Sequence, residues 1–91
     1  MPSVKFTKHL KRFFPDLRAV EAVEARTAAE VVAALEARHP GLGSYIVDER
    51  GALRQHVNIF IGDALIFDRE RLSDPVGPDD RVYIFQALSG G

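Results

Sequence analysis

The chain has 91 residues, of which 46% are hydrophobic and 27% charged, and its 12 basic and 13 acidic residues give a formal net charge of −1. This composition is typical of one globular domain, and the charge gives no general case for binding nucleic acid or an anionic membrane. The chain has no cysteine, which excludes disulfides, thiolate metal ligands and a cysteine nucleophile. Because the sequence shows neither a membrane span nor a secretory signal, we expect a cytoplasmic protein.

A first strand is expected over residues 3–10, where Val4 and Phe6 alternate with polar side chains. The same part of the chain holds its one local basic cluster, which consists of Lys5, Lys8, His9, Lys11 and Arg12. Lysines on an edge strand also prevent unwanted strand pairing. We therefore interpret the cluster as a solvated strand face and not as a phosphate-binding track.

A second strand is expected over residues 18–25, after a turn at Phe13-Phe14-Pro15-Asp16. The segment alternates, with Val20 and Ala22 on one side and Glu21 on the other. This pattern favours a hairpin with the first strand. The alanines and glutamates of the segment are also compatible with a helix.

The clearest helix signal begins at Thr27, which with Glu30 matches a capping box. Apolar residues then recur at helical spacing, namely Ala28, Val31, Val32 and Leu35. Pro40-Gly41 predicts the end of the helix, so we place it near residues 28–39. His39 is interpreted as a helix-end residue and not as a ligand or base.

The second half of the chain predicts mainly strands. In order, it predicts a short turn and short strand within 42–48, a strand at 57–61, a turn at Gly62-Asp63, a strand at 65–67, a polar loop at 72–80 and a final strand at 81–86. A hairpin, a crossing helix and further strands indicate an α+β roll. We expect a mixed sheet with its first and last strands adjacent, one face covered by the helix and the other open. The expected core consists of Val31, Val32, Leu35, Ile59, Ile61, Val82 and Ile84.

Alternation along the last two long strands assigns three aromatic residues to the open face, namely Phe60, Tyr83 and Phe85. We expect these side chains to be solvent-exposed. Aromatic side chains gathered on a surface usually mark a protein contact, which favours a partner-docking surface. The alternatives are that a loop covers them or that the two faces are assigned in the wrong order.

No residues are spaced for catalysis or metal binding. Asp79 and Asp80 are better explained as a turn before the final strand. The three histidines are far apart in the sequence and have no metal-type spacing. Ser89 is interpreted as a small tail residue and not as a nucleophile. From the residues alone, no catalytic set and no metal site stands out.

The sequence ends in Gly90-Gly91, directly after the last apolar stretch. Glycine does not hold local structure, because it loses the most backbone freedom on ordering. A glycyl carboxylate also has no Cβ to obstruct attack on it, so such a tip can enter a narrow site on another protein. Considered alone, Gly-Gly is better explained as a frayed end without function.

Taken together, these segments resemble the ubiquitin-like sulfur carriers of the MoaD/ThiS family. The matching parts are residues 57–63, residues 76–82 and Gly90-Gly91, and the resemblance extends over the chain in length and element order. It implies a β-grasp domain over residues 1–86 and a flexible tail over 87–91, which includes Leu88 and Ser89. It also implies a protein that binds no cofactor of its own.

The resemblance implies a specific chemistry at Gly91. An E1-like activating enzyme would use ATP to adenylate its carboxylate, and a sulfur donor would then displace AMP to leave a thiocarboxylate. The sulfur would pass to a biosynthetic enzyme or large subunit, with this chain as a carrier or as the non-catalytic small subunit of a sulfurtransferase such as molybdopterin synthase. The pathway stays open between molybdopterin, thiamine, cysteine and tRNA thiolation.

Two other functions stay open. A ubiquitin-like modifier would use the same activated carboxylate to form isopeptide bonds with lysines. A plain interaction domain would have no use for Gly90-Gly91.

Overall fold

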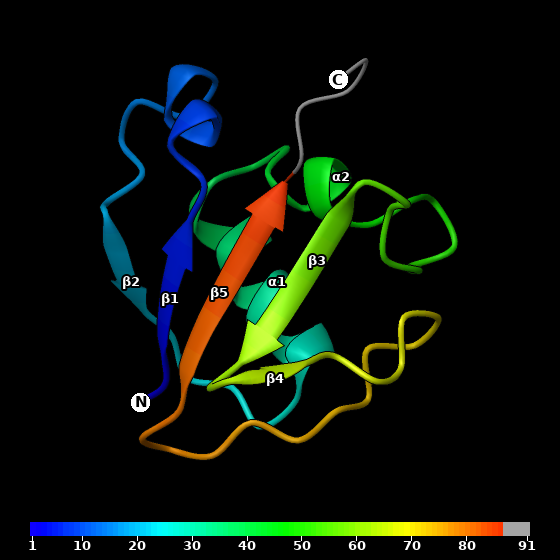
Figure 1. Cartoon of the computed structure of the whole chain (residues 1–91). Coiled ribbons are helices and arrows are strands. Elements are labelled where there is room, and N and C mark those ends of the chain that lie inside the picture. The colour runs from blue at the N-terminus through cyan, green and yellow to red at the C-terminus, as the bar shows by residue number, and fades with distance from the viewer. Residues whose placement is uncertain (87–91) are drawn as a thin grey trace.

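The computed structural model describes residues 1–86 of the chain (Figure 1). Its elements in order are β1 (Ser3–Phe6), the 3₁₀ helix η1 (Lys8–Arg12), β2 (Val20–Ala22), α1 (Ala28–Arg38), α2 (Gly43–Ile46), β3 (Val57–Ile61), β4 (Ala64–Leu65) and β5 (Arg81–Gln86). Among these residues, no helix is long and apolar enough to cross a membrane.

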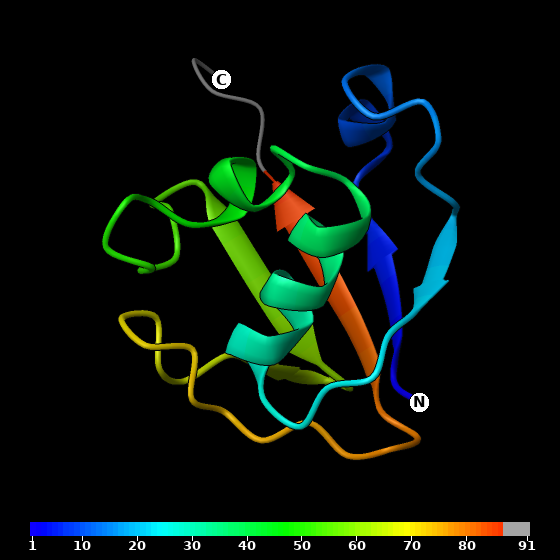
Figure 2. The ribbon, with the colours of Figure 1, turned by 180° about the vertical axis from the view of Figure 1, so that it is seen from behind.

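The five strands form one sheet in the order β2-β1-β5-β3-β4. β1 runs parallel to β5, whereas the β1–β2, β3–β5 and β3–β4 pairs are antiparallel. Helix α1 crosses one face of the sheet, as Figure 2 shows from behind, and among residues 1–86 no helix lies over the opposite face. The expected mixed sheet, the single long helix and the adjacent first and last strands are all confirmed.

Helix α1 begins where its local sequence predicts. The hydroxyl oxygen of Thr27 accepts the Glu30 N–H at 3.2 Å, and the Glu30 carboxylate accepts the Arg26 N–H at 3.0 Å. The reciprocal bond therefore reaches one residue further back than in the usual capping box. The helix ends at His39, whose N–H donates to the Leu35 carbonyl at 2.8 Å, and Gly41 then turns the chain with φ +98°.

The core lies between α1 and the covered face of the sheet. Six of the seven expected core residues are buried, namely Val31, Val32, Leu35, Ile59, Val82 and Ile84. Ile61 is only half-buried, because it closes β3 beside the turn at Gly62. Leu72 and Val76, in the loop before β5, are also buried, which attaches this loop to the core.

The first strand is shorter than expected. It stops at Phe6, and residues 8–12 turn into η1, which carries Leu10 back into the core at 1% exposure. Leu10 would point inward in an extended strand and also does so in the 3₁₀ helix. The apolar pattern alone therefore could not distinguish these two structures.

The second strand is the expected one, paired with β1, but it spans only Val20–Ala22. Its charged residue faces inward: Glu21 is 5% exposed, whereas Val20 is 44% exposed. Inward charge is a known way to protect an edge strand from unwanted pairing. The Glu21 carboxylate accepts the Arg18 N–H at 2.9 Å and Nη1 of Arg38 at 3.0 Å.

Two further expectations in the second half are wrong in detail. Residues 43–46 form the short helix α2 and not a strand, and only the isolated bridge between Val47 and Leu53 is extended there. The last hairpin turns at Gly62, with φ +63°, as predicted. Its second strand, however, is Ala64–Leu65, and Ile66 follows it with its N–H donated to the Ile59 carbonyl at 2.7 Å.

Candidate partner-binding face and tail root

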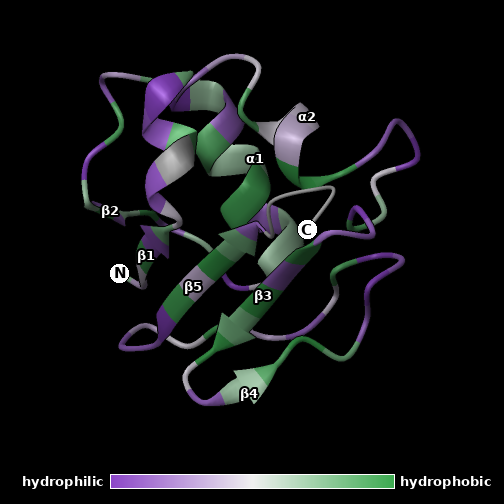
Figure 3. Cartoon of the chain, turned by 45° about the horizontal axis from the view of Figure 1, so that its top comes forward, coloured by the Kyte–Doolittle hydropathy of each residue, from purple (hydrophilic) through white to green (hydrophobic). Residues whose placement is uncertain are grey.

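A row of paired residues crosses the open face of the sheet. In order across the five strands, the row consists of Val20, Lys5, Tyr83, Phe60 and Leu65. Directly paired residues of neighbouring strands point to the same face, so the register itself assembles this row. The burial pattern along β5 alternates between exposed and buried residues, and Figure 3 shows β5 lying beside β3 in the sheet. We call these five residues, together with Phe85, the sheet-face row.

The three aromatic residues lie on the face predicted for them. Tyr83 and Phe85 are each 37% exposed, and their ring centroids are 6.1 Å apart. Phe60 is half-buried, because Tyr83 and Leu65 flank it in the row. The expected exposure is therefore confirmed for Tyr83 and Phe85, whereas Phe60 is less exposed than expected.

The sequence analysis missed Leu65 as part of this surface. Its side chain is 53% exposed beside Phe60. Lys5 and Val20 join the row from the other side through β1 and β2. Strand order decides which side chains become neighbours, and no local pattern within a strand carries that information.

The end of β5 fixes the point from which the tail departs. The Gln86 N–H donates to Oγ1 of Thr7 at 2.8 Å, and the Thr7 N–H donates to the Ile84 carbonyl at 3.2 Å. Nε2 of Gln86 lies 3.3 Å from Nε2 of His56, the residue just before β3. We call Thr7, His56 and Gln86 the tail root. The predicted tail residues Leu88, Ser89, Gly90 and Gly91 lie outside the described part of the chain.

Arg69 forms a set of hydrogen bonds next to the aromatic side chains of the sheet-face row. Its guanidinium donates to Oδ1 of Asn58 at 2.7 Å, and also to the Arg54 carbonyl at 2.8 Å and the Val57 carbonyl at 2.9 Å. Asn58 is paired with Phe85 across β3 and β5. The loop after β4 is thereby fastened to the strand that carries the surface.

The charged cluster around Glu21 is structural. Burial alone would raise the pKa of this carboxyl group, but hydrogen bonds from the Arg18 N–H and the Arg38 side chain hold its pKa below its ordinary value. Nε2 of His39 lies 3.4 Å from the same carboxylate and lowers the pKa further. His39 is thus a helix-end residue, as predicted, and joins α1 to β2.

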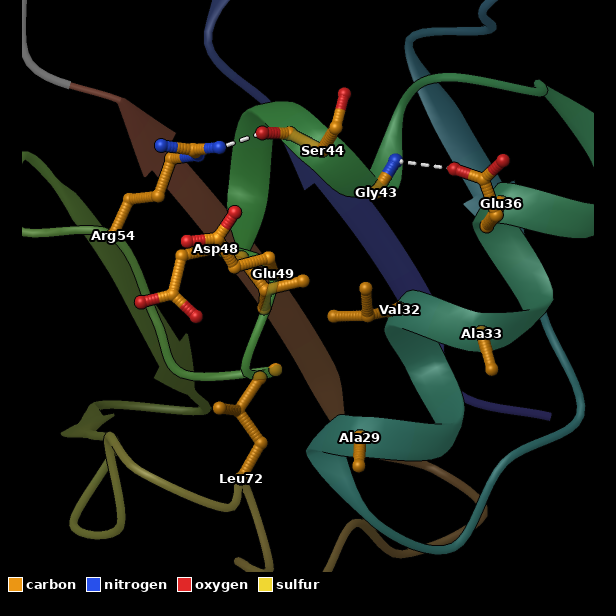
Figure 4. Close-up of a pocket in the computed structure, with 12 residues that line it drawn as sticks. Ala29, Val32, Ala33, Glu36, Gly43, Ser44, Asp48, Glu49, Arg54 and Leu72 are labelled. Carbon is orange, nitrogen blue, oxygen red and sulfur yellow. Dashed lines mark hydrogen bonds between the residues drawn. The ribbon is translucent and has the colours of Figure 1, made fainter.

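A hollow of about 530 Å³ lies on the helix side, between α1, α2 and the following loop (Figure 4). Two of its three acidic residues, Glu36 and Asp48, accept hydrogen bonds from the backbone. The Glu36 carboxylate accepts the N–H groups of Gly41 at 2.9 Å and Gly43 at 2.8 Å, and these bonds lower its pKa. Hydrogen bonds from Arg50 and Ala52 lower the pKa of Asp48 in the same way. The two carboxylates thus fix the backbone of the segments that follow α1 and α2.

Among residues 1–86, no group of three or more His, Asp or Glu side chains is placed to hold a metal ion. Asp80 accepts the Gly77 N–H at 2.7 Å, which supports its role in a turn. The candidate features of the described part of the chain are therefore the partly exposed sheet-face row and the hydrogen-bonded tail root.

A five-stranded mixed sheet crossed by one long helix places the protein in the ubiquitin-like β-grasp class. The model of the ThiS family matches residues 4–91, and the chain belongs to the ThiS family. No curated protein matches the sequence.

Solved structures agree on the fold. A chain in the crystal structure of the BexX/CysO complex of Amycolatopsis orientalis has a TM-score of 0.85 at 21% identity, with 100% of both chains covered. CysO of Mycobacterium tuberculosis has a TM-score of 0.84 at 22% identity, covering 97% of this chain and 100% of its own. SAMP1 of Haloferax volcanii has a TM-score of 0.80 at 22% identity, covering 99% of this chain and 98% of its own. At these identities the likeness concerns the fold alone.

Proposed function

We propose that the protein is a sulfur carrier that works through the carboxyl group of Gly91. The observation that carries this proposal is the match to the ThiS family, which extends through Gly90-Gly91. An E1-like enzyme would use ATP to adenylate the carboxylate, because a carboxylate is a poor electrophile until it carries a good leaving group. Sulfide from a donor would then displace AMP and leave a thiocarboxylate.

The geometry supports a division of labour between surface and tail. The tail root holds Gln86 through Thr7 at 2.8 Å, so the activated end departs from a fixed point beside the sheet-face row. A partner that covers Tyr83, Phe85 and Leu65 would therefore receive the five tail residues at a defined distance. Five residues reach at most about 18 Å from Gln86, which is enough to enter a narrow active site.

The proposed partners are the activating enzyme and a sulfur-accepting biosynthetic enzyme or large subunit. Both would bind the sheet-face row. Its partly exposed aromatic and aliphatic side chains would lose contact with water on binding, and the removal of apolar surface from water favours association. The protein itself would supply no catalytic group and bind no cofactor. Molybdopterin, thiamine and cysteine synthesis are all compatible with this chemistry.

A second function is favoured by the likeness to small archaeal modifier proteins, SAMP1 of Haloferax volcanii and of Methanosarcina acetivorans. The same adenylate could be attacked by a lysine amine to form an isopeptide bond. The two functions share activation and differ in the acceptor.

Pyrophosphate exchange with a purified candidate activating enzyme tests the shared first step. The wild-type chain should stimulate exchange of labelled pyrophosphate into ATP, and a chain without Gly91 should not. Exchange that is independent of Gly91 would refute the proposal. Conjugates of an epitope-tagged chain on cellular lysines, together with no sulfur-loaded form, would favour the modifier.

A further inference from the structure

A second surface feature adjoins the sheet-face row. A groove of about 600 Å³ lies between η1, β1 and the segment that enters β2. Its apolar lining includes Phe6, Leu17 and Val20, and Tyr83 of the sheet-face row forms one of its walls. The groove is thus continuous with the surface proposed to meet partner enzymes.

Four cations surround this groove, namely Lys5, Lys8, Lys11 and Arg18, and none of the acidic residues in the described part of the chain lines it. Within residues 1–86 the salt bridges join Glu21 to Arg38 and His39, and none involves the four cations. In a chain of net charge −1, this concentrates positive charge at one place. We call the feature the basic groove.

The unexpected 3₁₀ helix creates this arrangement. A 3₁₀ helix has about three residues per turn, so side chains at i and i+3 project from the same side. Lys8 and Lys11 are three residues apart in η1 and therefore project together, and both line the groove with Arg18. In an extended strand the same two lysines would have pointed to opposite faces.

We propose that the basic groove receives an acidic segment of a partner protein. Carboxylates of this segment would pair with the four cations, and its apolar side chains would lie on Phe6, Leu17 and Val20. The inference rests on the proposed function, because the partner would be one that also covers Tyr83. Charge complementarity of this kind mainly sets the rate and specificity of encounter.

The lining favours a protein segment over a polyanion. Nucleic acid is held by cations that follow its phosphates over a long path, whereas here four cations surround one apolar hollow. A membrane surface would not fill a recessed lining. The occupant that fits both features is a short segment that alternates acidic and apolar residues.

The test uses the full chain and a short synthetic peptide in which Asp and Glu alternate with Leu and Phe. A second peptide, with Lys in place of every Asp and Glu, controls for hydrophobic binding. In an NMR titration, the acidic peptide should shift the amide signals of Lys8, Val20 and Tyr83, and the lysine peptide should not. Added salt should weaken the acidic peptide's binding.

Charge-reversal variants locate the site. The double variant K8E/K11E should bind the acidic peptide about tenfold more weakly, because two exposed pairs become repulsive. The variant R50E/R71E has the same net charge, but its substitutions lie outside the groove, so it should bind like the wild type. Circular dichroism checks that both variants fold, and K8Q/K11Q replaces the first variant if it does not.

Several results would overturn the proposal. These are binding of both peptides alike, binding of neither, or equal losses in the two charge-reversal variants. Tighter, groove-dependent binding of a single-stranded oligonucleotide or of phosphatidylserine vesicles would assign the groove to a different partner. The chain without Gly91 should bind the acidic peptide normally, so a failure of sulfur loading refutes the proposed function and leaves the result for the groove standing.

Discussion

Neighbouring residues of β5 provide the sharpest test of how the two faces of the sheet are divided. Ile84 is fully buried against the core, and Phe85 points to the open face at 37% exposure. Truncating Ile84 to alanine should lower the free energy of unfolding by about 2–5 kcal/mol, because it removes buried carbons and leaves a cavity. Full burial of a phenylalanine is worth about 1.5–3 kcal/mol, and 63% of the Phe85 surface is buried, so Phe85→Ala should cost about 1–2 kcal/mol.

The loss of partner binding should be larger for Phe85→Ala than for Ile84→Ala, which is the reverse of their loss of stability. Phe85→Ala should weaken binding to the activating enzyme by about tenfold or more, since it removes an aromatic side chain from the proposed contact. Ile84→Ala should bind almost normally under conditions where it is folded. Urea denaturation and isothermal titration calorimetry give the two quantities. A Phe85→Ala variant that loses as much stability as Ile84→Ala, with unchanged binding, would refute the division into core and docking faces.

Three further variants test other parts of the account. Thr7→Val removes the acceptor of the Gln86 N–H, so it should lower the free energy of unfolding by about 1 kcal/mol and speed amide exchange at Gln86. Thr7→Ser keeps the hydroxyl and should do neither. Equal exchange in both variants would mean that the hydroxyl does not hold the tail root. The lowered pKa of Glu21 stabilises the fold at pH values above its ordinary value of 4.5, and this stability is lost as pH falls through the lower folded value. Glu21→Gln should therefore flatten the acid limb of a curve of unfolding free energy against pH. An unchanged acid limb would contradict this. Leu35→Ala should cost about 2–5 kcal/mol in denaturant unfolding, and a neutral result would show that the buried face of α1 is wrongly assigned.

Helix α1 and the long strands could be predicted because their signals are local. Thr27 and Glu30 form the start of the helix within four residues of sequence. In β3 and β5, successive residues point to opposite faces of the sheet. This assigns Ile84 to the core face and Phe85 to the open face without knowledge of their neighbours. Local hydrogen bonding and a two-residue period depend little on the rest of the fold.

The parts that were wrong or left open depend on distant contacts. Residues 8–12 leave the strand because Leu10 reaches the core through a turn, and Lys8 and Lys11 come together as a consequence. Glu21 faces inward because Arg38, at the far end of α1, meets it there. Leu65 became part of the candidate site only through the strand order, which pairs it with Phe60.

The central claim is that Gly91 carries the sulfur, and intact mass spectrometry tests it most directly. The purified chain would be incubated with its activating enzyme, ATP and a sulfur source, and a chain without Gly91 and a chain with one added residue would be treated alike. The account predicts that the wild type alone gains the mass difference of one oxygen exchanged for sulfur, localised to Gly91. Sulfur loading that survives in the shortened chain would contradict it.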